Sequence, residues 1–149
     1  NRRALEQGLQ REWYRCLDQR RPLSALMIDV DHFKQYNDKF GHLEGDVLLR
    51  EIAQSLKTNH DAKRELLARF GGEEFALLLP GVSLEDAVQR ADKIRLAVTE
   101  HNRNITVSIG VAGFVPSIQM EQISLLRRAD AALYRAKRGG RNRVEKDND

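Results

Sequence analysis

Two acidic segments hold the side chains best suited to chemistry. Asp29 and Asp31 flank Val30 at the end of an apolar run, and Glu73 and Glu74 follow a pair of glycines. Strand pairing would bring the segments to one edge of a sheet, where their carboxylates repel one another unless a cation neutralises them. Hard oxygen ligands select Mg²⁺ or Mn²⁺, above all when phosphate oxygens complete the shell. The alternative is that Glu73 and Glu74 are solvated acids of an ordinary turn.

A basic segment near the C-terminus adds positive charge. Residues 135–143 read Arg-Ala-Lys-Arg-Gly-Gly-Arg-Asn-Arg. The chain holds 25 Lys and Arg against 22 Asp and Glu, interleaved outside this segment, for a formal net charge of +3. A short basic cluster suits a polyphosphate as well as a nucleic acid. Because of the interleaving, we expect no nucleic-acid partner.

The length of 149 residues suits one domain with one core, and we expect residues 1–149 to form it. Hydrophobic residues make up 41% and charged residues 32%, an ordinary balance for a soluble chain. The apolar runs are too short to span a bilayer, and we see no signal peptide. The lone Cys16 cannot form an intrachain disulfide, which favours a reducing, cytoplasmic location. Since the sequence starts without methionine, we expect a C-terminal piece of a longer protein.

Hydrophobic periodicity predicts the order of the elements. Helical spacing occurs in five segments: 2–19, 31–40, 46–57, 84–98 and 121–137. Strand patterns occupy 23–30, 66–69, 75–79 and 105–112, with a short edge strand from residue 144. The tail 146–149 is expected to fray.

Local signals support two of these boundaries. Gly71 and Gly72 stand between two apolar runs, which indicates a hairpin because glycine accepts positive φ at little cost. Ser83 precedes a helical pattern, with Asp86 as its capping-box partner.

The element order predicts the fold class. A β-α-α-β-β-α-β core is an α+β, ferredoxin-like palm sandwich, here with an added N-terminal helix. We expect a central, mainly antiparallel sheet with helices covering one face.

Five sequence blocks resemble those of the GGDEF domain of diguanylate cyclases, in the GGEEF form of the signature. The signature block is Gly71-Gly72-Glu73-Glu74-Phe75. The other blocks are residues 29–38 (DVDHFKQYND), 41–46 (GHLEGD), 108–112 (SIGVA) and 129–142 (ADAALYRAKRGGRN). The resemblance spans nearly the whole chain, and five blocks in order are far more specific than the signature alone.

The resemblance implies a metal site. Asp29 and Glu73 would bind Mg²⁺ (or Mn²⁺), two ions per active site, through their side chains, and Val30 through its carbonyl. Glu74 would help to hold the metals and is a candidate for taking the proton from the attacking hydroxyl. The glycines of the signature, which belong to the catalytic segment, would let the hairpin approach a triphosphate closely.

The resemblance also implies a GTP site. Asn37 and Asp46 would hydrogen-bond the guanine edge, because an aspartate can accept from both N1–H and the exocyclic amine. His42 would flank this pocket, although a loop histidine that holds the turn is an equal alternative.

The triphosphate would lie near the start of the second helix. His32 and Phe33 would donate backbone N–H groups at a helix N-terminus, where anions are favoured. Lys34, Lys137 and Arg141 would bind phosphate oxygens. The alternative for Lys34 is an ordinary solvated helix lysine.

The implied reaction is the condensation of two GTP into cyclic di-GMP and two pyrophosphates. Each domain would hold one GTP, so a homodimer is required, and the product would serve bacterial second-messenger signalling, as in biofilm control. We expect no membrane contact within this piece, although a longer parent could be anchored to the inner membrane. Two alternatives remain open: a non-catalytic sensor that binds GTP or cyclic di-GMP, and a cyclase that makes a mixed purine product.

One feature of many family members is missing. Their product-inhibition motif, R-x-x-D, ends five residues before the signature, where this chain reads Ala62-Lys63-Arg64-Glu65. Alanine offers no donors at the arginine position, and an arginine fork is not easily replaced. We therefore expect no feedback inhibition through this position.

Overall fold

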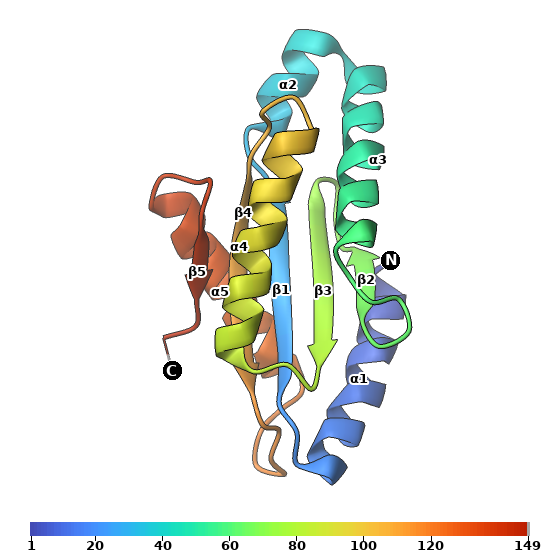
Figure 1. Ribbon diagram of the computed structural model, residues 1–149, viewed down its shortest axis with the longest axis vertical. Helices are drawn as coiled ribbons and strands as arrows, with labels where there is room; N and C mark the ends of the chain where they lie inside the picture. The colour runs from blue at the N-terminus through green and yellow to red at the C-terminus, as the bar shows by residue number, and fades with distance from the viewer. Residues whose placement is uncertain (149) are drawn as a thin grey trace.

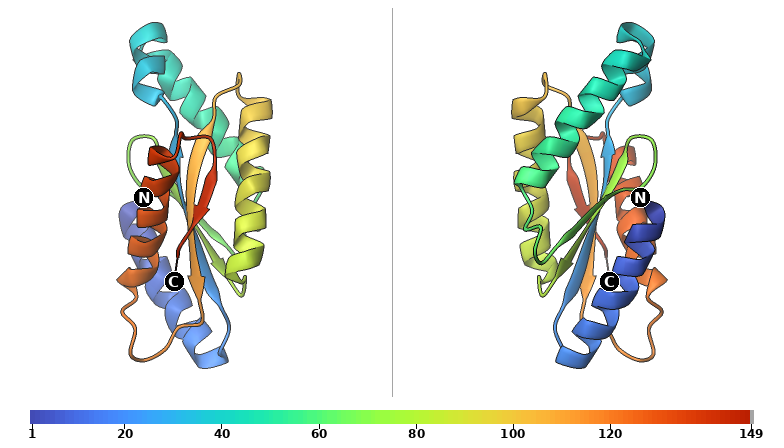
Figure 2. Two further views of the ribbon diagram at one scale, coloured as in Figure 1. Left: turned by 90° about the vertical axis from the view of Figure 1, so that its left-hand side faces the viewer. Right: turned by 90° about the vertical axis from the view of Figure 1, so that its right-hand side faces the viewer.

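A five-stranded sheet separates two layers of helices in the computed structural model, which describes residues 1–148 (Figures 1 and 2). The helices are α1 (Arg2–Gln19), α2 (Phe33–Phe40), α3 (His42–Thr58), α4 (Leu84–His101) and α5 (Ile123–Arg138). The strands are β1 (Leu23–Val30), β2 (Leu66–Arg69), β3 (Glu74–Pro80), β4 (Val107–Phe114) and β5 (Val144–Lys146). The predicted α+β palm fold with its added N-terminal helix is confirmed.

Strand β1 forms the centre of the sheet. The strand order is β2-β3-β1-β4-β5, and β1 pairs antiparallel with both β3 and β4. The edge strand β5 pairs parallel with β4. The mainly antiparallel sheet and the short edge strand near residue 144 are therefore confirmed.

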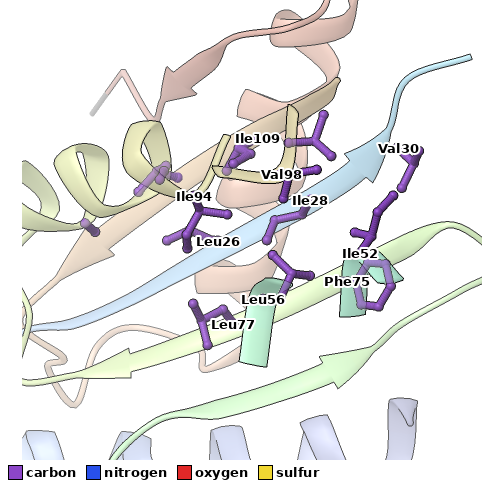
Figure 3. Close-up of a cluster of buried hydrophobic side chains, with 14 of the residues drawn as sticks. Leu26, Ile28, Val30, Ile52, Leu56, Phe75, Leu77, Ile94, Val98 and Ile109 are labelled. Carbon is purple, nitrogen blue, oxygen red and sulfur yellow. The ribbon is translucent and has the colours of Figure 1, made fainter. Parts of the chain in front are cut away.

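Helices cover both faces of the sheet, so the prediction that they cover only one is wrong. Leu26, Ile28 and Val30 pack against α3 and α4 in the cluster of Figure 3, whereas Ala25 and Met27 pack against α1 and α5. The physical reason is visible in β1, whose eight residues are all buried. A strand with one solvated face would alternate polar and apolar side chains instead.

Helix α2 and the start of α3 project beyond the end of the sheet at which β1 finishes (Figures 1 and 2). No residue of α2 is fully buried, and α3 begins at His42 rather than at the predicted residue 46. The buried leucines and isoleucine of α3 lie from Leu48 onward, where the helix crosses the sheet. The sequence pattern therefore found the buried part of α3 and missed its exposed first turn.

Several predicted boundaries shift by a few residues. The predicted helix 31–40 begins at Phe33, because His32 takes a left-handed φ of 58°. Ser83 caps α4 by accepting a hydrogen bond from the Asp86 amide at 3.2 Å, as predicted. At the C-terminus, Asp147 donates its N–H to a β4 carbonyl and pairs with Arg128. The expected fraying is therefore wrong at 146–147, and residue 149 lies outside the described residues.

The glycine hairpin is confirmed, but the predicted reason is wrong. Strands β2 and β3 pair antiparallel on either side of the two signature glycines, neither of which has positive φ. Instead, the Arg69 guanidinium donates to the carbonyls of Gly71 and Gly72, with its closest contact at 2.6 Å to Gly72. This side chain stabilises the loop by satisfying carbonyls that no strand partner reaches.

Candidate active site at the end of the central strand

Asp29 lies at the meeting point of three strands. It is 5% exposed, its Cα pairs with Glu74 on β3 and with Ser108 on β4, and its carboxylate forms an ion pair with Lys137 of α5. The Asp29–Glu74 register places the two acidic segments side by side, as strand pairing predicted. The contact with Lys137 was not predicted, because it depends on how α5 docks.

The surroundings of Asp29 and Glu74 make it unfavourable for both carboxyls to be ionised. Burial raises the pKa of Asp29, and Glu73 and Asp31 add repulsion, while Lys137 acts in the opposite direction. Burial also raises the pKa of Glu74, with repulsion from Asp29 as the next cause. Ionising both carboxyls is therefore costly without further positive charge at this edge.

Glu73 and Glu74 face different spaces although they are adjacent. Glu73 lines a cavity of about 170 Å³ together with Asp29. Glu74 instead lines a neighbouring pocket on the α1–α5 side, with Phe70 and Asp130 among its walls. Asp130 also contributes to the raised pKa of Glu74, and the sequence reasoning gave it no role.

The cavity beside Glu73 gathers acidic and basic groups. Its walls come from the end of β1, the start of α2, the hairpin and the C-terminal basic segment. They are Asp29, Val30, Asp31, His32, Phe33, Lys34, Gln35, Glu73, Lys137 and Arg141. This set includes all the predicted phosphate-binding residues and three of the four predicted metal ligands, and it lies at the N-terminus of α2, which favours anions.

The residues predicted to read guanine lie outside this cavity, on the projecting α2–α3 pair. Asp46 and His42 are exposed on the first turns of α3. Asn37 lies on α2 with its Oδ1 atom buried, without a hydrogen-bond partner, against Gly45. Gly45 thus brings Asn37 next to the helix turn that carries Asp46.

The carboxylates fit a hard divalent cation by their chemistry. Asp29 already forms an ion pair with the Lys137 ammonium. Glu73 and Val30 line the same cavity as Asp29. Within residues 1–148, no three acidic, histidine or cysteine side chains are arranged around a common point for a metal. Asp29 is instead paired with Lys137. In the same described residues, no helix is both long and apolar enough to cross a membrane.

The fold and the site define an α+β palm domain whose central strand ends in paired acids beside a small cavity lined by both acidic and basic groups. Residues 1–143 match the family model described as diguanylate cyclase, GGDEF domain. The chain belongs to this family, which confirms the resemblance.

Relatives and solved structures agree with this assignment. The chain is 41% identical to diguanylate cyclase DgcP of Pseudomonas aeruginosa, over 97% of this chain and 22% of DgcP. It is 44% identical to response regulator PleD of Caulobacter vibrioides, over 83% of this chain and 29% of PleD. The chain therefore spans less than a third of the length of these two relatives.

Two solved domains match nearly the whole fold. One is the active GGEEF domain of a diguanylate cyclase from Vibrio cholerae, with a TM-score of 0.91, 35% identity, and coverage of 100% of this chain and 97% of that one. The other is the GGDEF domain of DgcB from Caulobacter crescentus in complex with c-di-GMP, with a TM-score of 0.91, 34% identity, and coverage of 100% and 89%.

Proposed function

We propose that this protein condenses two GTP molecules into cyclic di-GMP, with release of two pyrophosphates. The observation that carries the proposal is the pairing of Asp29 with the signature hairpin at the rim of a cavity that also holds Lys34, Lys137 and Arg141. Acidic groups for cations and basic groups for phosphates thus face one space. Relatives more than 40% identical that are named diguanylate cyclases support the same chemistry.

The metal ligands are the side chains of Asp29 and Glu73, the Val30 carbonyl and, in a supporting role, Glu74. Two Mg²⁺ (or Mn²⁺) ions bound there would stabilise the charge that develops on the phosphates. Asp29 now holds a cation, the Lys137 ammonium. With a divalent cation on Asp29, Lys137 would be available to bind phosphate oxygens, together with Lys34 and Arg141.

The nucleotide extends from this cavity to the projecting helices. The N–H groups of His32 and Phe33 bind the terminal phosphates, and Asn37 and Asp46 hydrogen-bond guanine, with His42 beside them. The 3′-hydroxyl oxygen of one GTP bonds to the α-phosphorus of the other, and the bond from that phosphorus to the β-phosphate oxygen breaks. Glu74 takes the hydroxyl proton. Since each domain holds one GTP, two copies must face each other as a homodimer.

A product assay tests the proposal directly. Incubation with Mg²⁺ and GTP should give cyclic di-GMP by mass, at a rate that rises with more than the first power of protein concentration. Glu74→Gln should abolish the product with no loss of thermal stability. The matched control is Glu85→Gln, an exposed acid on α4 at the opposite end of the sheet. GTP binding without product would support a sensor instead, and a mixed product with ATP would support a cyclase of broader selectivity.

We also infer that the product does not inhibit through residues 62–65. Glu65, at the position of the motif aspartate, has a side chain only 6% exposed and accepts two hydrogen bonds from Arg90, at 2.8 and 2.7 Å. Its carboxylate is committed to the fold and is not free to pair with a base. Arg64 is 84% exposed with a loose 3.9 Å contact to Asp61.

We place the domain in the cytoplasm, where Cys16 stays reduced.

A further inference from the structure

Asp31, the second acid of the 29–31 segment, is buried and fully hydrogen-bonded. Its Oδ1 accepts from the Ser108 hydroxyl at 2.6 Å, and its Oδ2 accepts from the Thr106 hydroxyl at 2.7 Å and from the Asn142 backbone N–H at 3.0 Å. The side chain is 5% exposed. The proposed reaction gives Asp31 no role. A buried charge needs partners, and these three hydrogen bonds supply them.

These bonds join three segments that are far apart in sequence. Asp31 follows β1, Thr106 and Ser108 lie at the start of β4, and Asn142 belongs to the turn before β5. The Asp31 N–H also donates to the Thr106 carbonyl at 2.9 Å. Asp31 therefore holds the turn before β5 against the end of the central strand.

The clamped turn has an unusual backbone. Arg141 and Asn142 have φ values of 63° and 45°, in the left-handed region that non-glycine residues rarely adopt. Such a conformation persists only where surrounding contacts hold it. On the far side, the Asn142 side chain accepts a hydrogen bond from Arg95 at 2.8 Å. The main chain of the turn is held by Asp31 at Asn142 and by α5 at Arg141, whose N–H donates to the Ala136 carbonyl at 3.0 Å, and the Asn142 side chain is held by α4.

The hydrogen bond from the Asn142 N–H to Asp31, called the clamp below, helps to hold the turn that carries Arg141. Arg141 lines the same cavity as Asp29, Glu73 and Lys137, yet the turn that carries it follows the end of α5 rather than belonging to a helix or strand. Through one hydrogen bond, Asp31 ties this turn to the strand that carries Asp29. The groups for cation and phosphate are thereby kept in one cavity.

We propose that Asp31 is a positioning residue for triphosphate binding, which acts by holding the Arg141–Asn142 turn. The inference rests on the proposed function, because it assigns Arg141 to the phosphates. It differs from a purely structural role in one measurable respect. A clamp that sets Arg141 affects ligands in proportion to the phosphates that Arg141 contacts, whereas a general weakening of the fold affects all nucleotides alike.

The test compares GTP with GMP, by calorimetry in Mg²⁺ on this chain. Asp31→Asn keeps the shape but loses the charge and one acceptor. It should weaken GTP binding about tenfold, the usual loss for a hydrogen bond to a charged group, and should change GMP binding less than about twofold. Ser108→Ala is the matched control, because it removes a donor to the other carboxylate oxygen and spares the Asn142 bond. It should leave GTP affinity within about threefold.

A double-mutant cycle locates the effect. In an Arg141→Gln background, Asp31→Asn should cause no further loss of GTP affinity. Additive losses, or equal losses for GTP and GMP, overturn the positioning role. If Asp31→Asn unfolds the domain, Asp31→Glu provides the second variant, since it keeps the charge and displaces the turn, and the same GTP-selective loss is expected. If Arg141→Gln alone leaves GTP binding unchanged, the proposed phosphate site is wrong, a failure distinct from that of the clamp.

Discussion

Gly45→Ala should separate nucleotide binding from stability. Gly45 lies in the second turn of α3, and a Cβ built on it would stand 1.7 Å from Asn37 Oδ1 and 3.2 Å from the end of the Phe33 ring. Since real Cβ contacts stay above 3.0 Å, the Asn37 carboxamide must retreat by about 1.3 Å. The Phe33 ring needs to give by only a few tenths of an ångström.

Gly45→Ala should not lower the stability of the domain, but it should lower its affinity for GTP. Alanine is favoured over glycine inside a helix by up to about 1 kcal/mol, so the melting temperature should hold or rise. A displacement of more than 1 Å breaks a hydrogen bond from Asn37 to guanine. That loss is worth about 1.4 kcal/mol, or about tenfold in GTP affinity. The variant should be at least as stable as the parent and bind GTP about tenfold more weakly.

Calorimetry with GTP, beside thermal unfolding, measures both effects. The control is the same substitution in an Asn37→Ala background, where no carboxamide remains to be displaced. There Gly45→Ala should leave GTP affinity unchanged and show only the helix gain. Unchanged GTP affinity in the single variant would refute the reasoning, and so would a loss that persists without Asn37, since either result separates Gly45 from the guanine contact.

Three further predictions concern the recognition of guanine, inhibition by the product, and the contribution of Glu65 to stability at acidic pH. Asp46→Ala should weaken GTP binding more than ATP binding by calorimetry, because it removes the acceptor for N1–H and the amine; equal losses would take Asp46 out of the base pocket. Cyclic di-GMP added to a progress curve should not inhibit strongly, and strong non-competitive inhibition that is lost in Arg64→Ala would show that Arg64 replaces the missing arginine. Burial works to raise the pKa of Glu65, but hydrogen bonds from Arg90 and a backbone N–H outweigh it and lower the pKa below its ordinary 4.5. The carboxylate therefore stabilises the fold fully above pH 4.5, and this contribution falls as the pH drops through the folded pKa. The difference in unfolding free energy between the parent and Glu65→Gln should shrink over that acidic range.

Sequence reasoning found what local pattern and strand pairing determine. Strand pairing was expected to bring the two acidic segments together, and the antiparallel register of β1 and β3 places Asp29 beside Glu74. The ion pair between Asp29 and Lys137 could not be read in the same way, since it joins residues more than a hundred positions apart through the docking of α5. The roles of the site residues follow from the family resemblance and remain predictions.

Two further features were not predicted correctly from the sequence. The left-handed φ values at Arg141 and Asn142 are held by contacts with Ala136, Asp31 and Arg95, and of the two residue types only asparagine favours that conformation. The covering of both sheet faces is consistent with the four consecutive apolar residues 25–28 of β1, a pattern typical of a strand that is buried on both faces.

Asp29 and Asp31 show how surroundings separate two acids of one segment. Asp31 has three donors without formal charge, two hydroxyls and a backbone N–H, so its carboxylate is satisfied with no cation. Asp29 has a single charged partner, Lys137, and a pKa raised by burial and by neighbouring acids. Under the proposed function, Asp29 would hold a divalent ion and Lys137 would be available for phosphate, whereas the hydrogen-bond partners of Asp31 are uncharged. The two acids therefore suit the different roles proposed for them, Asp29 as a metal ligand and Asp31 in holding the Arg141–Asn142 turn.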